Sequence, residues 1–301
     1  MSDQSKAVLF FNPKAGQVKD DHTLPMIQSH FAKHSIDLKI YTVPKPKEEL
    51  HKLVSECIND GYELFIAAGG DGTVSFISDP LVNTGKPLGI IPIGTGNLIA
   101  KTLKIPIKLE KSLDLITSND HKTRGIDAIK VINDRNYISN VSAGVSPELM
   151  SDTRQEDKQK MGFFAYIIKL GQKLLGLQQH RYYLEYDHQT TTYLATEILI
   201  TNGSKTGLTH VEWPEEIQID DGLLDIIVLQ AANIFDFLGL VFSLFSRTSE
   251  KNPKFKKITF SQYCRIASRS PQYIQADGDV VSKTPIEVQV LPHAVNIIVK
   301  S

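Results

Sequence analysis

The sequence predicts an α/β domain built on a mostly parallel sheet, followed by a β-rich domain with a sandwich-like arrangement of strands. Three observations support this fold class. Apolar runs alternate with helical patterns over about the first hundred residues, which is typical of parallel strands covered by helices. Beyond residue 125, short strand patterns follow one another with few helical segments between them. The chain of 301 residues is also long enough for two domains.

The first domain begins with a buried strand and continues as alternating helices and strands. The strands are expected at residues 7–11, 37–43, 64–68 and 88–93, and the helices at residues 23–34, at 46–59 and from residue 73 onward. Glu48 and Glu49 lie in the first turn of the second helix, where the helix dipole favours negative charge. The carboxyl ends of such parallel strands meet at one edge of the sheet, where these folds bind their ligands.

The second domain is expected to consist mainly of short strands. They are predicted at residues 126–132, 136–141, 182–186, 192–200 and 224–229, with several more toward the C-terminus. Two helical segments, at residues 146–177 and 234–246, interrupt them. The change of pattern places the first domain at residues 1–125 and the second at residues 126–293, with a last strand at about 294–301 returning to the first domain.

Composition excludes several classes of protein. The chain has 33 Lys and Arg against 34 Asp and Glu, a net charge of −1, which argues against a nucleic-acid partner. Cys57 and Cys264 lie far apart and have no metal-binding spacing, so we expect a reduced, cytoplasmic chain. No apolar stretch reaches the roughly 18 residues of a membrane span, so any membrane contact is expected to be peripheral.

Three turn-rich segments follow predicted strands at the same edge of the first sheet. They are residues 12–16, the G-G-D-G-T segment at residues 69–73, and residues 92–97. Glycines allow backbone N–H groups to approach a phosphate closely, and a following helix N-terminus adds favourable potential. Alone, the second segment also fits a tight turn in which Asp71 caps a helix. Three such loops at one edge favour a nucleotide crevice, although neither a Walker A motif nor G-x-G-x-x-G occurs.

These loops and two acidic segments resemble the diacylglycerol kinase catalytic-domain family, which includes sphingosine, ceramide and bacterial lipid kinases. Residues 220–225 are similar to the family's D-G-x-L-D segment, and residues 276–279 to its D-G-E motif. The motifs occur in the family's order from about Lys6 to the end. The resemblance implies a topology shared by NAD kinases and diacylglycerol kinases. It also implies a lipid kinase that transfers the γ-phosphoryl group of ATP to a hydroxyl of diacylglycerol or a related lipid.

The resemblance further implies roles for single residues. Asp277 would be the general base, Asp279 would help to bind the catalytic Mg²⁺, and Asp220 and Asp221 would support a structural Mg²⁺. On turn chemistry alone, this last pair equally fits a solvated turn before a strand. The ATP-binding residues implied are Asn12, Thr42, Gly69, Gly70, Asp71, Gly72, Thr73, Gly94, Thr95 and Asn97. Phosphoryl transfer requires these parts, namely phosphate positioning, a divalent ion and a carboxylate aimed at the nucleophile.

Two positions depart from the pattern of the bacterial diacylglycerol kinases. Leu98 replaces their usual Asp, and the last acid of D-G-E is Asp279 instead of Glu. Diacylglycerol, a long-chain base and a phosphatidylglycerol-like lipid therefore stay open as substrates. One alternative function is an NAD kinase-like enzyme, although the N-x-G-x-L-G-F and T-P-T-G-S-T-A-Y segments of that family are missing. Another is a catalytically weak regulator that binds a nucleotide or lipid.

Two apolar helical patterns are accompanied by basic residues. Lys169 and Lys173 interrupt the first, and the second, at residues 234–245, is followed by Arg247, Lys251, Lys254, Lys256 and Lys257. This pattern is typical of a helix that docks on anionic lipid. A core-facing helix beside a solvated run of charges is the alternative. We therefore expect a lipid substrate and peripheral contact with an anionic membrane, while a homodimer is left open.

Overall fold

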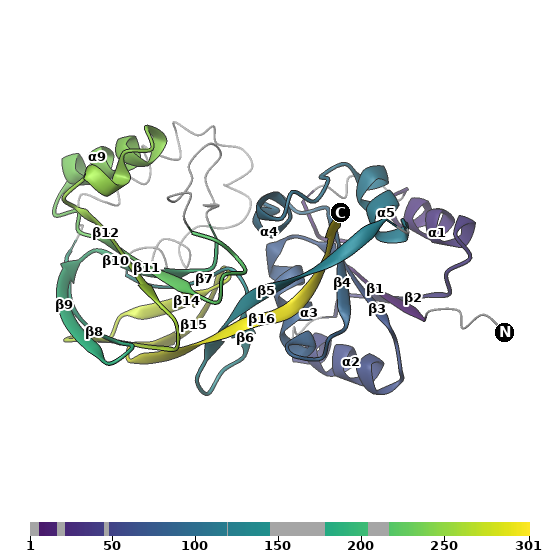
Figure 1. Ribbon diagram of the computed structural model, residues 1–301, viewed down its shortest axis with the longest axis horizontal. Helices are drawn as coiled ribbons and strands as arrows, with labels where there is room; N and C mark the ends of the chain where they lie inside the picture. Colours follow the sequence, from purple (N-terminus) through teal and green to yellow (C-terminus); the bar gives the residue numbers. More distant parts are fainter. Residues whose placement is uncertain (1–5, 17–21, 45–47, 119, 145–177, 204–216) are drawn as a thin grey trace.

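The computed structural model describes residues 6–16, 22–44, 48–118, 120–144, 178–203 and 217–301. Within these residues the chain folds into two halves that lie side by side, an N-terminal half with helices on both faces of a sheet and a C-terminal half built mainly from strands (Figure 1). The helix predicted at residues 146–177 lies outside the described residues and stays a prediction.

The N-terminal half contains four parallel strands in the order β2-β1-β3-β4. Its elements are β1 (Ala7–Phe11), α1 (Thr23–Lys33), β2 (Leu38–Thr42), α2 (Glu48–Asn59), β3 (Leu64–Gly69), α3 (Asp71–Leu81), β4 (Pro87–Pro92), α4 (Leu98–Thr102) and α5 (Leu109–Thr117). Each predicted strand and helix is present, and α5 is an addition. Its short apolar pattern, with Leu113 and Ile116 buried, gives too weak a signal in the sequence.

The C-terminal half contains the remaining elements. They are β5 (His121–Val131), β6 (Asn136–Tyr137), β7 (Asn140–Gly144), β8 (His180–Tyr186), β9 (Gln189–Ala195), β10 (Glu197–Thr201), β11 (Leu224–Leu229), α9 (Ile234–Phe245), η2 (Ser249–Lys251), β12 (Phe255–Phe260), β13 (Tyr263–Ser268), β14 (Tyr273–Ala276), β15 (Asp279–Lys283) and β16 (Ile286–Lys300). The strand predicted at residues 192–200 is two strands, because Thr196 marks the point where the chain leaves β9 for a second sheet. The strand predicted at residues 136–141 likewise divides into β6 and β7. The expected fold class, a mostly parallel α/β half and an antiparallel β half, is confirmed.

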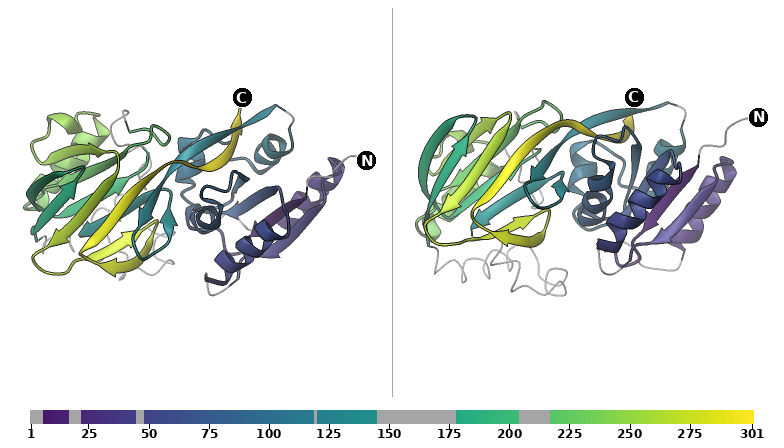
Figure 2. Two further views of the ribbon diagram at one scale, coloured as in Figure 1. Left: turned by 60° about the horizontal axis from the view of Figure 1, so that its bottom comes forward. Right: turned by 90° about the horizontal axis from the view of Figure 1, so that it is seen from below.

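Strand β16 joins the two halves. It pairs with β13 at one end, with β4 at the other, and with β5 along most of its length. Figures 1 and 2 show β5 and β16 crossing together between the halves. A ten-stranded sheet therefore runs from one half into the other, while a six-stranded sheet, β12-β11-β10-β7-β14-β15, belongs to the C-terminal half. The predicted domain boundary near residue 125 falls inside β5 and stays a prediction.

Two layers of helices cover the parallel sheet. Leu9, Ile66 and Ile91 pack with α1 and α5 on one face, and Val8 and Phe65 pack with α2 and α3 on the other. Strands buried on both faces read as continuous apolar runs, which is why β1 and β3 could be recognised from sequence. The helices leave the carboxyl edge of the sheet open for the loops that follow β1, β3 and β4.

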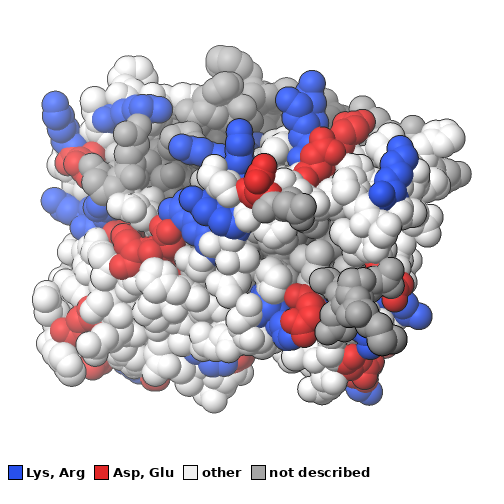
Figure 3. Space-filling view, turned by 45° about the vertical axis from the view of Figure 1, so that its right-hand side comes forward, with Lys and Arg blue, Asp and Glu red and all other residues white. Residues whose placement is uncertain are grey.

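The described helices include none that is both long and apolar enough to cross a bilayer. Figure 3 shows Lys and Arg side chains interspersed with Asp and Glu on the face it draws.

We expect the substitution Ile297→Ala to destabilise the whole chain. Ile297 is fully buried in β16 and pairs with Leu88 of β4 and Arg124 of β5, so truncation leaves a cavity where the halves join. The expected loss is about 2–5 kcal/mol of unfolding free energy, measured by urea denaturation. Lys300→Ala, at an exposed position of the same strand, is the control and should change it by less than about 0.5 kcal/mol. Equal midpoints for the two variants would contradict this role of β16.

Candidate active site

Two glycine loops touch at the carboxyl edge of the parallel sheet. Gly70 lies between β3 and α3, and Gly94 follows β4; a Cβ added at Gly94 would collide with the backbone of Gly70. The backbone N–H of Ile93 also donates to the carbonyl of Gly69 at 3.2 Å. Glycine at these positions is therefore a packing requirement, because it lets two backbones approach more closely than side chains would allow.

Asn97 gives the second loop its shape. Its Oδ1 accepts from the N–H of Gly94 at 3.0 Å, and its Nδ2 donates to the carbonyls of Gly94 at 2.8 Å and Pro92 at 3.2 Å. The residue has a left-handed backbone, with a φ of 52°, and is almost fully buried. The loop itself uses the amide of Asn97, so this residue shapes the loop while Thr95 is exposed at its tip.

Asn12 connects the first loop to the G-G-D-G-T segment. Its Nδ2 donates to Thr73 Oγ1 at 2.9 Å, and its Oδ1 accepts from the N–H of Lys14 at 3.0 Å. Thr42 ends β2 at the same edge but has no hydrogen bond to the glycine loops within the described part of the chain. The structure thus brings together the predicted residues of three loops and leaves Thr42 beside them.

Asp71 is a partly buried carboxylate between the two glycine loops. Its Oδ1 accepts from the N–H of Ile99 at 3.1 Å, and its Oδ2 lies against Gly96. Burial raises the pKa of Asp71, the N–H groups of Ile99 and Leu98 lower it, and the negative charge of Asp277 raises it further. The net effect is a raised pKa, so this carboxylate binds a proton more readily than an ordinary aspartate.

Asp277 reaches the same region from the other half of the molecule. It lies in the turn between β14 and β15, and its Oδ2 accepts from Ser75 Oγ at 2.5 Å and from the N–H of Ile138 at 3.1 Å. Its Oδ1 accepts from the N–H groups of Ser139 at 3.1 Å and Asn140 at 2.8 Å. Both oxygens thus have two donors each, which occupies the four lone-pair sites of a carboxylate. This hydrogen-bonded set joins α3 to the C-terminal half.

Arg135 supports Asp277 through Ser75. Its guanidinium lies over the rings of Phe76, at 3.8 Å from the centroid, and Tyr137, at 4.0 Å. Its Nη1 donates to Ser75 Oγ at 3.0 Å, so Ser75 accepts from Arg135 while donating to Asp277. Its Nη2 is buried without a hydrogen-bond partner among the described residues. No sequence motif identified Arg135, because its contacts with Ser75 and Phe76 join segments about 60 residues apart.

A cavity of about 850 Å³ lies beside this network, which is within the size range of small-molecule sites. Its lining combines aromatic, acidic and basic side chains from both halves: His51, Phe76, Asp79, Lys130, Asp134, Arg135, Asn136, Tyr137, Asp279, Val280 and Val281. Asp279 is the single residue of this lining that the sequence analysis singled out. The others come from α2, α3, β15 and the segment from the end of β5 to β6, and the fold alone brings them together.

The acidic pair at residues 220 and 221 does not form an open cation site. Arg124 binds Asp220 in a bidentate ion pair, with distances of 2.5 Å from Nε to Oδ2 and 2.6 Å from Nη2 to Oδ1, and this hydrogen bonding lowers the pKa of Asp220. Asp221 is exposed and accepts from the N–H of Leu223 at 3.0 Å. No three or more His, Cys, Asp or Glu side chains gather as a metal-binding group among the described residues.

Asp127 is a further carboxylate that the sequence analysis did not identify. It is fully buried and accepts from the N–H of Gly222 at 2.8 Å and from the N–H of His293 at 2.7 Å. Burial raises the pKa of Asp127. These contacts hold the segment that is similar to D-G-x-L-D against β16. They give that segment a structural role.

Comparison with known proteins identifies the family. The Diacylglycerol kinase catalytic domain matches residues 6–131, and the YegS C-terminal NAD kinase beta sandwich-like domain matches residues 139–299. The chain belongs to the diacylglycerol kinase family. The resemblance given by the glycine loops and the two acidic segments is therefore confirmed, and membership of a kinase family supports the expected class of enzyme.

Individual relatives of this diacylglycerol kinase family member cover most of its length. An uncharacterized protein of Synechocystis sp. is 32% identical over 302 residues, which cover 96% of this chain and 69% of that protein. A diacylglycerol kinase of Staphylococcus saprophyticus is 27% identical and aligns with 94% of this chain and 91% of its own. The crystal structure of a diacylglycerol kinase from Bacillus anthracis superimposes with a TM-score of 0.78 at 24% identity, covering 100% of this chain and 99% of that one. This last likeness supports the fold.

We expect Gly94→Ala to separate the two glycine loops of this kinase-family protein. The added Cβ meets the backbone of Gly70, so the loops must shift at a cost of about 1–3 kcal/mol in unfolding free energy. Gly72→Ala is the matched control, because nothing lies within 4 Å of a Cβ at that helical position. It should keep the stability unchanged or raise it by up to about 1 kcal/mol. Thermal and urea unfolding measure both variants, and a Gly94→Ala protein as stable as Gly72→Ala would refute the packing argument.

Proposed function

We propose that this protein is an ATP- and Mg²⁺-dependent lipid kinase that phosphorylates a hydroxyl of diacylglycerol or a related lipid. One observation carries the proposal. Asp71 is a partly buried carboxylate that lies between the two glycine loops and has a raised pKa. The negative charge of Asp277, from the other half, is one cause of the raised pKa. Phosphoryl transfer needs this combination of phosphate-binding backbone and a proton acceptor near the nucleophile. The diacylglycerol kinases among its relatives support the lipid as acceptor.

The glycine loops and the cavity provide complementary parts of a nucleotide site. The loop from Gly69 to Thr73 and the tip at Thr95 would face phosphate oxygens through backbone N–H groups and hydroxyls. In the cavity, Arg135 carries a buried Nη2 that has no partner among the described residues, and a phosphate oxygen would satisfy it. Lys130 adds a second positive charge to the lining. The same lining has three aspartates, Asp79, Asp134 and Asp279, so a phosphate would bind there together with a cation.

Mg²⁺ would enter with the nucleotide. This ion is commonly held by substrate phosphates, waters and one or two carboxylates, so a protein cage of several acids is not required. Asp279 lines the cavity and would supply such a carboxylate, as its place in the D-G-E-like motif predicts. When bound, the ion offsets negative charge that develops on the transferred group. A structural ion at Asp220 and Asp221 does not fit, because Arg124 occupies Asp220.

The hydrogen bonds support different roles for the two carboxylates. A general base needs a lone pair that the substrate hydroxyl can reach, and the four donors around Asp277 occupy both of its oxygens. We therefore assign proton abstraction to Asp71 and a positioning role to Asp277, the residue that the sequence motif favoured as base. The negative charge of Asp277 raises the pKa of Asp71 and so makes that carboxylate a better proton acceptor.

The activity itself can be tested with the purified protein, Mg²⁺ and labelled ATP. Acceptors would be diacylglycerol, a long-chain base and phosphatidylglycerol in neutral detergent micelles, with NAD as a separate acceptor. We expect label in one of the lipids, identified by mass spectrometry. Label in NAD and in no lipid would instead favour an NAD kinase-like enzyme.

We expect Asp71→Asn to lower kcat by about 10²–10⁴-fold without loss of stability. The raised pKa of Asp71 means that its ionised form is disfavoured in the folded chain, and the stability linked to its protonation is lost as the pH rises through the folded pKa. At neutral pH the uncharged Asn should therefore match or exceed the wild type in thermal stability. For the same reason, the acidic limb of the kcat/KM profile should lie at a higher pH than an ordinary aspartate would give.

Asp277→Asn is the comparison variant. Replacing one acceptor oxygen by an NH₂ group opposes two of the four donors, so the variant should lose about 1–3 kcal/mol of unfolding free energy. Its activity should fall, and the acidic limb should move to lower pH, because the negative charge that raises the pKa of Asp71 is lost. An active Asp71→Asn protein, together with an inactive but fully stable Asp277→Asn protein, would reverse the two assignments.

A further inference from the structure

Helix α9 is apolar on two faces. Leu240 and Leu244 are buried and pack with Ile227 of β11 and Phe255 of β12. The other face carries four apolar side chains with helical spacing that are exposed to solvent: Phe235 (80% exposed), Leu238 (44%), Phe242 (72%) and Phe245 (41%). A helix that only covers the core needs one apolar face, so the exposed one calls for an apolar partner.

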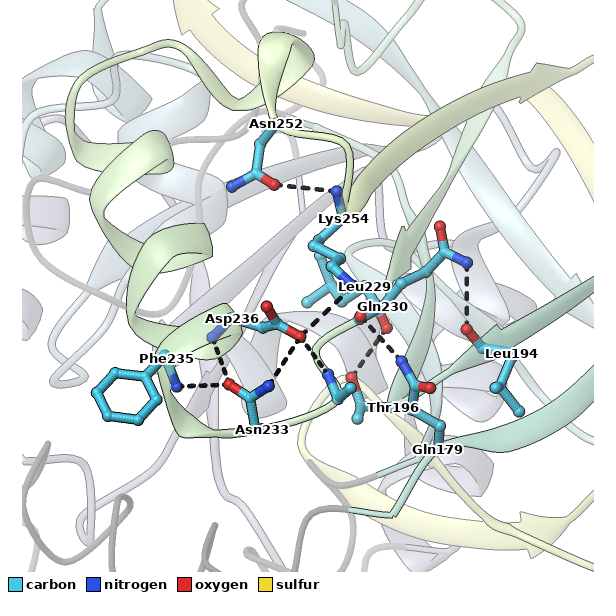
Figure 4. Close-up of polar contacts among 11 residues, drawn as sticks. Gln179, Leu194, Thr196, Leu229, Gln230, Asn233, Phe235, Asp236, Asn252 and Lys254 are labelled. Atoms are coloured by element: carbon cyan, nitrogen blue, oxygen red, sulfur yellow. Dashed lines mark hydrogen bonds and ion pairs between the residues drawn. The ribbon is translucent and has the colours of Figure 1, made fainter.

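The exposed face is held in a fixed orientation. Asn233 caps α9, with its Oδ1 accepting from the N–H groups of Phe235 at 2.9 Å and Asp236 at 3.0 Å. Asp236 in turn accepts from the N–H of Ala232 at 2.9 Å and forms an ion pair with Lys254 at 3.5 Å. Figure 4 shows these contacts on one side of the helix end, with the ring of Phe235 turned away from them. The cap thus fixes the backbone at the start of the helix, from which Phe235 projects into solvent.

Basic residues follow the apolar face directly. Between residues 232 and 257 the chain has five basic residues, Arg247, Lys251, Lys254, Lys256 and Lys257, against two acidic ones, Asp236 and Glu250. Lys251 and Lys256 are exposed. Apolar side chains that enter the acyl boundary and basic side chains that meet lipid phosphates are the two components of interfacial binding by a helix.

We propose that α9, with the basic segment that follows it, docks on the surface of a bilayer containing anionic lipid. The docking surface consists of Phe235, Leu238, Phe242 and Phe245 together with Arg247, Lys251, Lys254 and Lys256. This inference rests on the proposed function, because a kinase whose acceptor is a lipid must reach the bilayer. The charge favours anionic lipid over a second copy of this chain, since two such surfaces in contact would bring their basic residues together.

The test is co-sedimentation of the full chain with vesicles, in the absence of ATP and of any acceptor lipid. Vesicles of phosphatidylserine mixed with phosphatidylcholine should bind the wild type, and vesicles of phosphatidylcholine alone should bind it at least about tenfold more weakly. The pair Phe235→Ser and Phe242→Ser should weaken binding to the anionic vesicles by about tenfold or more. The pair Lys251→Gln and Lys256→Gln should have a similar effect, which added salt should reproduce in the wild type.

Met26→Ser is the matched control, because Met26 is 42% exposed on α1 in the other half. It should bind vesicles like the wild type. Unchanged binding by both double variants would overturn the proposal, as would a wild-type dimer that the phenylalanine variant dissociates with no effect on vesicle binding. The lysine variant leaves α9 intact, so it keeps the test valid if the phenylalanine variant does not fold.

Kinase assays separate this proposal from the proposed function. With a short-chain, water-soluble diacylglycerol as acceptor, the phenylalanine variant should retain wild-type activity because no bilayer is involved. Vesicle binding through α9 without phosphorylation of any lipid would support the proposed docking surface and contradict the proposed kinase activity. Phosphorylation of the soluble lipid, together with unchanged vesicle binding by both double variants, would support the proposed activity and contradict the docking surface.

Discussion

The pairing of β16 with β5 determines how the two halves of this protein meet. The two strands run antiparallel across the boundary, and the last part of β16 adds to β4 as a parallel neighbour. A flexible linker would leave the relative position of the halves to side-chain contacts. This two-stranded connection instead fixes it by backbone hydrogen bonds, so the turn that carries Asp277 lies against Ser75 of α3. The candidate site is assembled from two halves, and the strands decide its geometry.

Asp277 and Asp71 are neighbouring carboxylates of this site with different surroundings and different proposed roles. Asp277 is surrounded by donors and organises the backbone of residues 138–140. Asp71 is partly buried with fewer donors and has a raised pKa, which costs stability at neutral pH but would suit the proton acceptor of the proposed reaction. Arg135 extends the arrangement toward the cavity, where its position between Phe76 and Tyr137 restricts its movement. Asp277 thus contributes to the stability of the site, and Asp71 has the surroundings that suit a reactive acid.

Sequence patterns predicted local features well and long-range ones poorly. The strand from Ala7 to Phe11 and the glycine loops could be recognised because their signals lie within a few consecutive residues. Asp277 could be singled out by its motif, but its four donors depend on segments more than a hundred residues away. Arg135 and the buried Asp127 carry no motif, and the cavity exists only where separate elements meet. Asp220 was selected as a metal ligand by its motif, while a distant arginine, Arg124, decides its surroundings.

The place of β16 in the sheet also bears on the order in which the molecule can form during its synthesis. The strands β1 to β4 are made early, but the neighbour that extends β4 into the ten-stranded sheet is contained in residues 286–300. Until that segment has left the ribosome, β4 and β5 present unpaired backbone along the line where β16 will lie. Contacts between residues so distant in sequence form slowly, and exposed strand edges invite association with other chains. A nascent chain of this protein is thus exposed to aggregation, and is a substrate for chaperones, until residues 286–300 have been made.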